Sequence, residues 1–423
     1  MLTLYNMTWN VAGTATAQAS RTHAYSPVTV TALLLLSVSY MAILSFLNAH
    51  GLRASTTLVG AAEALLFIVC AAAAIRHISP TAVLLLLGIC TWLLVASLFR
   101  QQIDAKGLRD LLIPILFICL GRHVADIDFA DRAAKIVLAA VVAVGLFEAV
   151  FVDAYSRLFN TFSFYINLGS INEQRAMFAG QMLTLNGFRP EGIGRTILPG
   201  LLGNHRVSSL LMDPVSLGNF AVIMLAWGLA KARAEWRQAL PFVVGALVLI
   251  TLADSRFGLM LLAVMVLMRL FPAKIIDRAA LLLPLLVVVA VIVIPLLAPS
   301  IGDNFLGRVT KSGVALLRFD VPILFGMADL PNFGDMGYAY IFSRFGLPLC
   351  VLLVVGVFLL PNQDPRGMRY RAFLMLYLSL ILSISGTSAF ALKTAGMLWF
   401  LLGVLTTLPA PAATQMTATG RSA

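Results

Sequence analysis

The sequence predicts an all-α polytopic protein that crosses a membrane about twelve times, as a single integral membrane domain over residues 1–423. Composition is the first reason, because 60% of the residues are hydrophobic, only 12% are charged and the mean hydropathy is +0.93. A soluble domain of this length carries about twice that charged fraction. The spacing of the apolar runs and the placement of positive charge between them are the other two reasons.

About twelve apolar runs are long enough to cross roughly 30 Å of hydrocarbon. The run near Leu111 is short, and the two runs over 240–271 are joined only by the turn 253–256. The runs begin near Val28, Leu58, Ala82, Leu111, Ile136, Leu217, Leu240, Phe257, Leu281, Tyr338, Tyr370 and Ala391.

Positive charge predicts the orientation of these spans. The short loops on one side are rich in lysine and arginine, so this side is predicted to be cytoplasmic and to hold both termini. No removed signal peptide is expected, because residues 1–27 are polar and lack a cleavage pattern. Arg100, Lys106 and Arg109 fall on the other side, against this preference, and nearby aspartates offset them in part. The basic residues of the cytoplasmic loops are Arg122, Arg132, Lys135, Lys231, Arg233, Arg237, Arg269, Lys274, Arg278, Arg366, Arg369 and Arg371.

Two long segments, 153–213 and 300–335, fall on the outer side. The first combines aromatic residues and amides, which suit sugar rings, with arginines, which suit phosphate. An aromatic belt at the membrane interface is the alternative explanation. The second segment predicts an amphipathic helix from Phe305 to Phe319, ended by Pro322, that lies on the membrane surface.

Three polar residues stand at the ends of predicted spans. Asp213 followed by Pro214 is typical of a helix start, so Asp213 is predicted to cap the sixth span, and its carboxylate can also orient Arg206. Arg206 either grips a phosphate or only contacts lipid headgroups. Arg256 is a cation in a very short outer turn, against the topological preference, which favours a functional cause over simple pairing with Asp254.

Several kinds of site are absent from the sequence. It has no Walker loop, no His/Cys metal cluster and no nucleophile elbow, so neither a nucleotide nor a metal ion is expected. The four cysteines have no paired or metal-like spacing. Basic loops and anionic headgroups account for the net charge of +11, so no nucleic-acid partner is expected. Glu63 and Glu148 are lone carboxylates inside predicted spans, without a partner that the sequence identifies.

Three stretches together resemble the O-antigen polymerase and O-antigen ligase superfamily. By motif the likeness covers roughly residues 200–360, and by the pattern of spans it covers the whole chain. The stretches are Arg206–Ser209 with Met212–Pro214 and Leu217–Gly218; Thr251 with Ser255–Gly258; and Phe325–Gly326 with Asp335–Tyr338 and Gly346–Leu347.

The resemblance implies a GT-C-like glycosyltransferase of the bacterial inner membrane. Such enzymes act at the periplasmic face and transfer a growing glycan from undecaprenyl diphosphate to the next lipid-linked repeat unit, without a metal or nucleotide cofactor. The ligase branch typically carries a histidine in the third stretch, where this chain has Asp335 at the same spacing before Gly346. That departure favours an exopolysaccharide-type polymerase over a ligase. The implied partners are undecaprenyl-diphosphate-linked glycans and membrane lipids, with a chain-length regulator and a flippase.

A diphosphate leaving group develops negative charge that cations must stabilise when no metal does so. Arg206 and Arg256 are predicted to form that clamp, and Asp335 is predicted to act as the general base. A ligase of the same fold and a secondary transporter or flippase stay open as alternatives. Against a transporter, the distinctive cations cluster on one face. The predicted substrate-binding residues are Arg189, Arg195, Asp213 and Tyr338.

Overall fold

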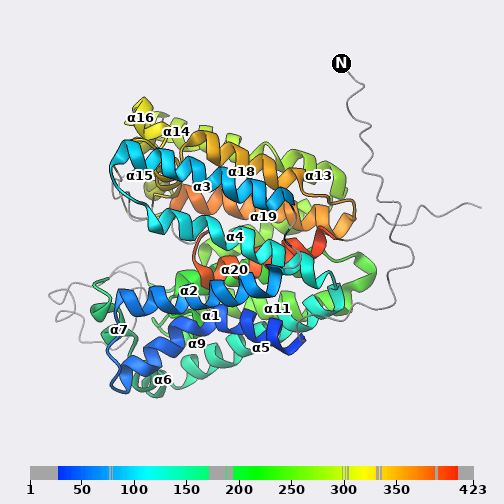
Figure 1. The fold of residues 1–423 in the computed structure, drawn as a ribbon. Helices are drawn as coiled ribbons and strands as arrows, with labels where there is room; N and C mark the ends of the chain where they lie inside the picture. Colours follow the sequence, from blue (N-terminus) through cyan, green and yellow to red (C-terminus); the bar gives the residue numbers. More distant parts are fainter. Residues whose placement is uncertain are drawn as a thin grey trace, which may run out of the picture.

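The computed structural model describes most of the chain between residues 27 and 407, and the described residues contain helices and no strand (Figure 1). The all-α prediction is therefore confirmed for this part of the chain. The described residues are 27–75, 78, 80–170, 187, 194–297, 299–300, 302, 304–329, 333, 336–385 and 389–407.

Six described helices are long and apolar enough to cross a membrane. Two bent pairs raise this number to eight if each pair is one span: α13 (Ala273–Ala280) with α14 (Leu283–Leu297), bent by 48°, and α17 (Gly337–Phe345) with α18 (Leu347–Leu359), bent by 105°. The chain is a multi-pass membrane protein by these criteria. The six helices are α1 (Pro27–Ala49), α2 (Thr56–Ala74), α3 (Pro80–Arg100), α5 (Ile127–Val150), α11 (Trp236–Leu252, with the turn η4, Arg233–Glu235, before it) and α19 (Pro365–Ile384).

The prediction of about twelve spans is only partly confirmed, because three of the predicted spans form helices that are short and a fourth forms a helix with several charged residues. Each remaining apolar run does form a helix. However, α10 (Pro214–Ala230), α12 (Arg256–Met268) and α20 (Leu392–Leu405) reach only about 20–26 Å at 1.5 Å per residue. The helix α4 (Ala105–Val124) is long enough but carries Lys106, Arg109, Asp110 and Arg122.

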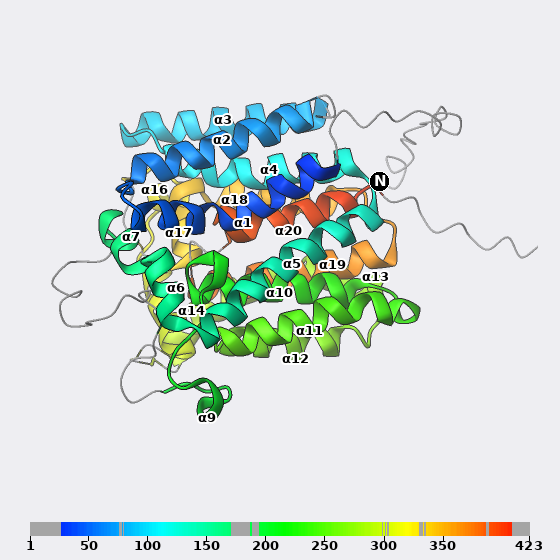
Figure 2. The same ribbon diagram turned by 90° about the horizontal axis from the view of Figure 1, so that it is seen from below.

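The short helices α10 and α20 lie inside the bundle (Figure 2), and nearly all of their residues are buried. Glycines bring α4 against α20: a Cβ added to Gly121 would lie 2.2 Å from Phe400 O, and one added to Gly403 would lie 2.3 Å from Ile118 O. Small residues allow such close backbone contact between membrane helices. Outer helices instead expose large apolar side chains, such as Leu98 of α3 at 71%, as a lipid-facing surface requires.

The described helices of both long polar segments lie at one end of the bundle, which we call the loop end (Figure 2). The helices there are α6 (Val152–Phe159), α7 (Thr161–Asn167), α9 (Pro199–Leu202), α15 (Phe305–Leu317) and α16 (Val321–Leu324). The opposite end carries the short connections around Lys231, Arg269 and Arg366, beside α13.

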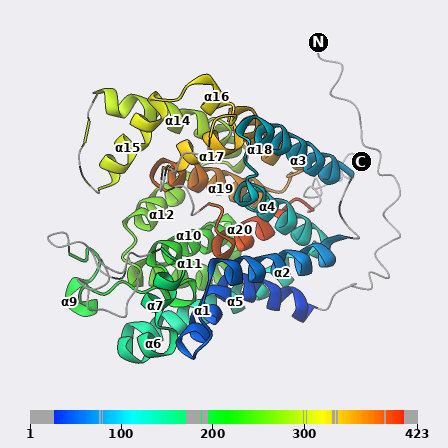
Figure 3. The same ribbon diagram turned by 60° about the vertical axis from the view of Figure 1, so that its left-hand side comes forward.

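The predicted amphipathic helix is confirmed as α15, which begins after its cap Asn304 and ends at Leu317, ahead of the helix α16 that contains Pro322. Its packing face lies against α14 (Figure 3), where a Cβ added to Gly313 would lie 2.0 Å from Val291 O. This face is therefore covered by protein. Phe305 and Leu306 of the same helix stay exposed, so its predicted place on the membrane surface stays a prediction.

Candidate functional site

The buried arginines of the site converge on the turn between α11 and α12. Arg195 donates from Nη2 to the carbonyls of Leu252, at 3.2 Å, and Thr251, and Arg206 donates from Nε to Ala253 O at 3.0 Å. The last carbonyls of a helix have no partner inside the helix and lie at the negative end of its dipole. Arg195 and Arg206 therefore stabilise the end of α11.

The loop 195–197 is fixed to the same turn by side chains on the α12 side. Asp254 is buried at φ +49, and its Oδ1 accepts hydrogen bonds from the amides of Thr196, at 3.0 Å, and Ile197, at 2.9 Å. Arg256 donates from Nε to Thr196 Oγ1 at 2.5 Å. Asp254 and Arg256 thus hold the same loop, an arrangement that differs from the simple ion pair considered from sequence.

Exposure separates Arg256 from the other two arginines. Arg195 and Arg206 are 5% and 7% exposed, whereas Arg256 is exposed at the first turn of α12. Within the described residues, its hydrogen bond to Thr196 uses only Nε. Both Nη atoms of Arg256 therefore have no hydrogen bond to a described residue.

The strip 205–212 before α10 is anchored by a carboxylate that the sequence left without a partner. Glu148 of α5 is fully buried and accepts hydrogen bonds from the amides of Ser208, at 3.0 Å, and Ser209, at 2.6 Å. It also lies 3.1 Å from His205 Nε2. A single carboxylate thus fixes the backbone after Arg206 and contacts the imidazole of the residue before it.

Three carbonyls of the strip receive hydrogen bonds from side chains of α6, α7 and α20. Ser209 and Met212 have φ of +51° and +60°, a left-handed conformation that is rare for such residues and needs tertiary support. Burial raises the pKa of the Tyr155 and Tyr165 hydroxyls, which therefore stay protonated as donors. The pairs are Tyr155 Oη to Ser209 O at 2.7 Å, Lys393 Nζ to Leu211 O at 2.7 Å and Tyr165 Oη to Met212 O at 2.9 Å.

Asp213 caps α10, as predicted. Its carboxylate accepts from the amides of Val215, at 3.3 Å, and Ser216, at 3.0 Å, and from Ser216 Oγ at 2.9 Å. Tyr338 is 2% exposed and donates to Ser379 O at 3.0 Å, which packs α17 on α19. The predicted residues Arg189 and Asp335 lie outside the described residues.

Glycines of the motif stretches meet one another in the fold. Gly326 and Gly346 have φ of +70° and +77°, and a Cβ on Gly346 would lie 2.5 Å from Phe325 O. Arg100 closes this contact by donating to the carbonyls of Gly326 and, at 2.7 Å, Arg344. These glycines of the third stretch therefore build the sharp bend between α17 and α18.

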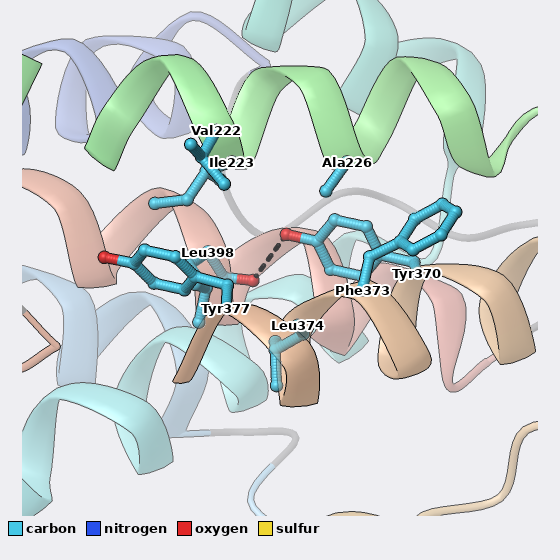
Figure 4. A pocket seen from close by; sticks show the side chains of 8 residues that line it. All are labelled: Val222, Ile223, Ala226, Tyr370, Phe373, Leu374, Tyr377 and Leu398. Atoms are coloured by element: carbon cyan, nitrogen blue, oxygen red, sulfur yellow. Dashed lines mark hydrogen bonds between the residues drawn. The ribbon is translucent and has the colours of Figure 1, made fainter. Parts of the chain in front are cut away.

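A cavity between α10, α19 and α20 is separate from these residues (Figure 4). Its volume is about 10 Å³, room for about one water molecule and far less than the ~300 Å³ of a small ligand pocket. Its lining is apolar except for Tyr370, whose hydroxyl donates to Leu398 O at 3.1 Å, and Tyr377. Such a cavity is too small and too apolar for a glycan.

We searched the described residues for groups that could hold a metal ion and for the state of the cysteines. In the described part of the chain, no group of three or more His, Cys, Asp or Glu side chains is placed to hold a metal ion. The four cysteines are free thiols, and three of them are buried.

Sequence reasoning singled out Glu148 without its partners, and it missed Tyr155, Tyr165 and Lys393, which also hold the strip. An ionisable residue in or beside an apolar run was the available signal for Glu148 and Lys393. Tyr155 and Tyr165 gave none beyond being aromatic.

Fold and site together define a multi-pass, all-α membrane protein with a cationic site at the loop end. No family model, no curated protein and no solved structure matches the chain. The likeness to the O-antigen polymerase and ligase superfamily rests on the three motif stretches.

Proposed function

We propose that this protein is a polysaccharide polymerase that joins undecaprenyl-diphosphate-linked oligosaccharide repeat units at the periplasmic face of the bacterial inner membrane. The observation that supports this most is the exposed guanidinium of Arg256, fixed beside buried Arg206 at the loop end. In this proposal the loop end is periplasmic, the chain passes the membrane about twelve times and both termini are cytoplasmic.

The proposed reaction is a glycosyl transfer between two lipid-linked substrates. A hydroxyl of the acceptor sugar attacks C1 of the donor glycan, the bond from C1 to the diphosphate oxygen breaks, and undecaprenyl diphosphate leaves. Arg256 stabilises the charge that develops on the leaving diphosphate, because guanidinium groups bind phosphate oxygens in pairs. Arg206 adds positive charge behind it, and Asp335 takes the proton of the attacking hydroxyl. Arg189 is a further proposed substrate contact. Arg195, Asp213 and Tyr338, which the sequence also predicted to bind substrate, instead support the protein around the site, because their polar atoms bond to Leu252, Ser216 and Ser379.

Purified protein in liposomes tests this function. The substrate is the pool of lipid-linked oligosaccharides that accumulates in a strain lacking the gene, and gel electrophoresis measures the length of the products. We expect lengthened lipid-linked glycans from the native chain and single repeats from Arg256→Ala. Lys311→Ala, an exposed cation on α15 at the same end, is the matched control and should give native lengths.

The two alternative functions give different products in the same liposomes. Transfer only to an added lipid A core or protein acceptor would identify a ligase. Movement of substrate across the bilayer without bond formation would identify a transporter. Either result, or native glycan lengths from Arg256→Ala, would overturn the proposed function or its clamp.

A further inference from the structure

A second charged cluster lies at the loop end, around Tyr340 of α17. Its acids are buried: Glu63 is 6%, Asp104 7% and Asp110 1% exposed. Tyr340 donates from its hydroxyl to Asp110 Oδ2 at 2.6 Å, and Tyr40 donates to Glu63 Oε1 at 2.7 Å. These acids form a buried layer beneath a layer of cations.

Two cations of the upper layer are paired with this acid layer. Arg109 binds Asp110 at 2.6 Å and Glu63 at 3.1 Å, and its side chain is 35% exposed. Arg344 binds Asp104 Oδ1 at 3.0 Å. Buried partners hold both guanidiniums in place, so their outward edges form a fixed positive surface. This pairing also explains why Arg109 is tolerated on the side that the charge distribution disfavours.

Lys106 is a cation of this cluster that has no such ion pair with a described acid. It is exposed in the first turn of α4, and its Nζ lies 5.0 Å above the ring of Tyr340. Within the described residues, no carboxylate lies within 4.0 Å of this ammonium. Lys106 therefore resembles Arg256, because each is the exposed cation of a cluster whose other cations are occupied by the fold.

The two clusters are joined by the start of α20. Phe390 packs against Tyr340 and Phe345, with ring centroids 6.4 and 5.7 Å apart, and Lys393 reaches Leu211 of the strip. One short segment therefore contacts both clusters.

We propose that Lys106, with the outward edge of Arg109, is a second binding site for the diphosphate of a lipid-linked substrate. The inference rests on the proposed function, which requires two such lipids at once. The diphosphate of the donor, which leaves as part of undecaprenyl diphosphate, binds to Arg256. The diphosphate of the acceptor binds to Lys106 and stays bonded to its own sugar during the transfer. Lysine suits this second role, since it binds phosphate as a point charge and stabilises no new charge there.

Native mass spectrometry in detergent tests the inference with undecaprenyl diphosphate itself as the probe. We expect two bound lipids on the native chain, one on Lys106→Ala, one on Arg256→Ala and none on the double variant. Each lost charged contact should weaken its site at least about tenfold. Lys106→Arg should keep two lipids, as should the control Lys311→Ala. Lys106 is exposed and makes no hydrogen bond to a described residue, so its variants should be folded.

Two outcomes would overturn the second site: Lys106→Ala that still binds two lipids, or a Lys106-dependent site that phosphatidylglycerol fills equally well. The liposome assay separates this failure from failure of the proposed function. If the liposomes show polymer growth but mass spectrometry shows one bound lipid whose binding does not depend on Lys106, only the second site is refuted. If mass spectrometry shows two lipids that depend on Lys106 and Arg256 as expected, but the liposomes show no polymer growth, only the polymerase function is refuted.

Discussion

The strip 205–212 at the loop end and the cluster around Asp131 at the opposite end use buried charge in different ways. Asp131 of α5 accepts hydrogen bonds from Lys231, from Arg366 at 3.0 Å and from Trp227 Nε1 at 2.7 Å. Its partners come from the ends of α10 and α19, so this cluster ties regular helices together. In the Asp131 cluster, charged side chains therefore pair with charged side chains.

At the strip, buried charged groups contact backbone. Glu148 accepts from amides, whereas Arg206 and Lys393 donate to carbonyls. The strip contains only one short 3-10 turn (Ser209–Leu211) and few backbone hydrogen bonds, such as Val207 N to Leu252 O at 3.0 Å, so side chains supply partners for its remaining backbone groups. The difference indicates that the Asp131 cluster stabilises the scaffold, and that the strip is an irregular segment held in one shape to place Arg206.

Removal of the acid at the opposite end should have the largest effect on stability. Asp131→Ala leaves Lys231 and Arg366 buried without their carboxylate, which should lower the unfolding free energy by about 3–5 kcal/mol. Thermal unfolding in detergent measures this loss. Asp128→Ala, an exposed acid on the same helix, is the matched control and should unfold close to the native chain.

The length of the glycans that Asp131→Ala makes also distinguishes the two ends of the bundle. Whatever fraction folds should make glycans of native length, because Asp131 only holds helices. Short glycans from well-folded Asp131→Ala would show that the two ends are not separate in role.

Replacement of the acid at the strip should cost less stability and more function. Glu148→Gln places an amide group against the N–H groups of Ser208 or Ser209, which should lower the unfolding free energy by about 2 kcal/mol. We also expect Arg206 to shift, so that the folded fraction makes short glycans. Asp153→Asn, an exposed acid on α6, is the control for loss of charge. Native glycan lengths from Glu148→Gln would contradict the role given to the strip.

The sequence predicted well what depends on neighbours along the chain. The cap at Asp213 and the helix α15 follow from local patterns. Arg206 and Arg256 were expected together, and they meet at one turn because α11 brings Ala253 back to the strip.

Contacts between distant residues escaped sequence reasoning. Glu148 lies 60 residues from Ser208, and Lys393 lies 182 residues from Leu211, distances over which periodicity carries no information. The number of spans is confirmed only in part for a related reason. Burial inside the bundle explains why helices such as α10 and α20 are apolar, and an apolar run does not reveal whether protein or lipid surrounds it.

A single hydroxyl at the strip should have a smaller effect. Tyr165→Phe leaves Met212 O without its donor, which should lower the unfolding free energy by about 1 kcal/mol. Tyr338→Phe is the matched comparison, because Ser379 lies inside α19 and its carbonyl keeps a helical partner. Thermal unfolding of the two variants should rank Tyr165→Phe as the less stable. Equal midpoints would mean that the strip does not depend on side-chain donors.

The smallest change in stability should come from Arg256→Ala, within about 0.5 kcal/mol of the native chain, because the lost side chain is exposed. Its effect on polymer growth should be the opposite, a fall of about 10²–10³, as for other groups that stabilise charge in a transition state. Arg195→Ala tests the contrast beside it, because Arg195 is buried and donates to the end of α11. That variant should lose stability first and activity only in proportion. If both arginine variants unfolded equally early, Arg256 would belong to the scaffold, and the exposed cation would no longer mark the place where a diphosphate binds.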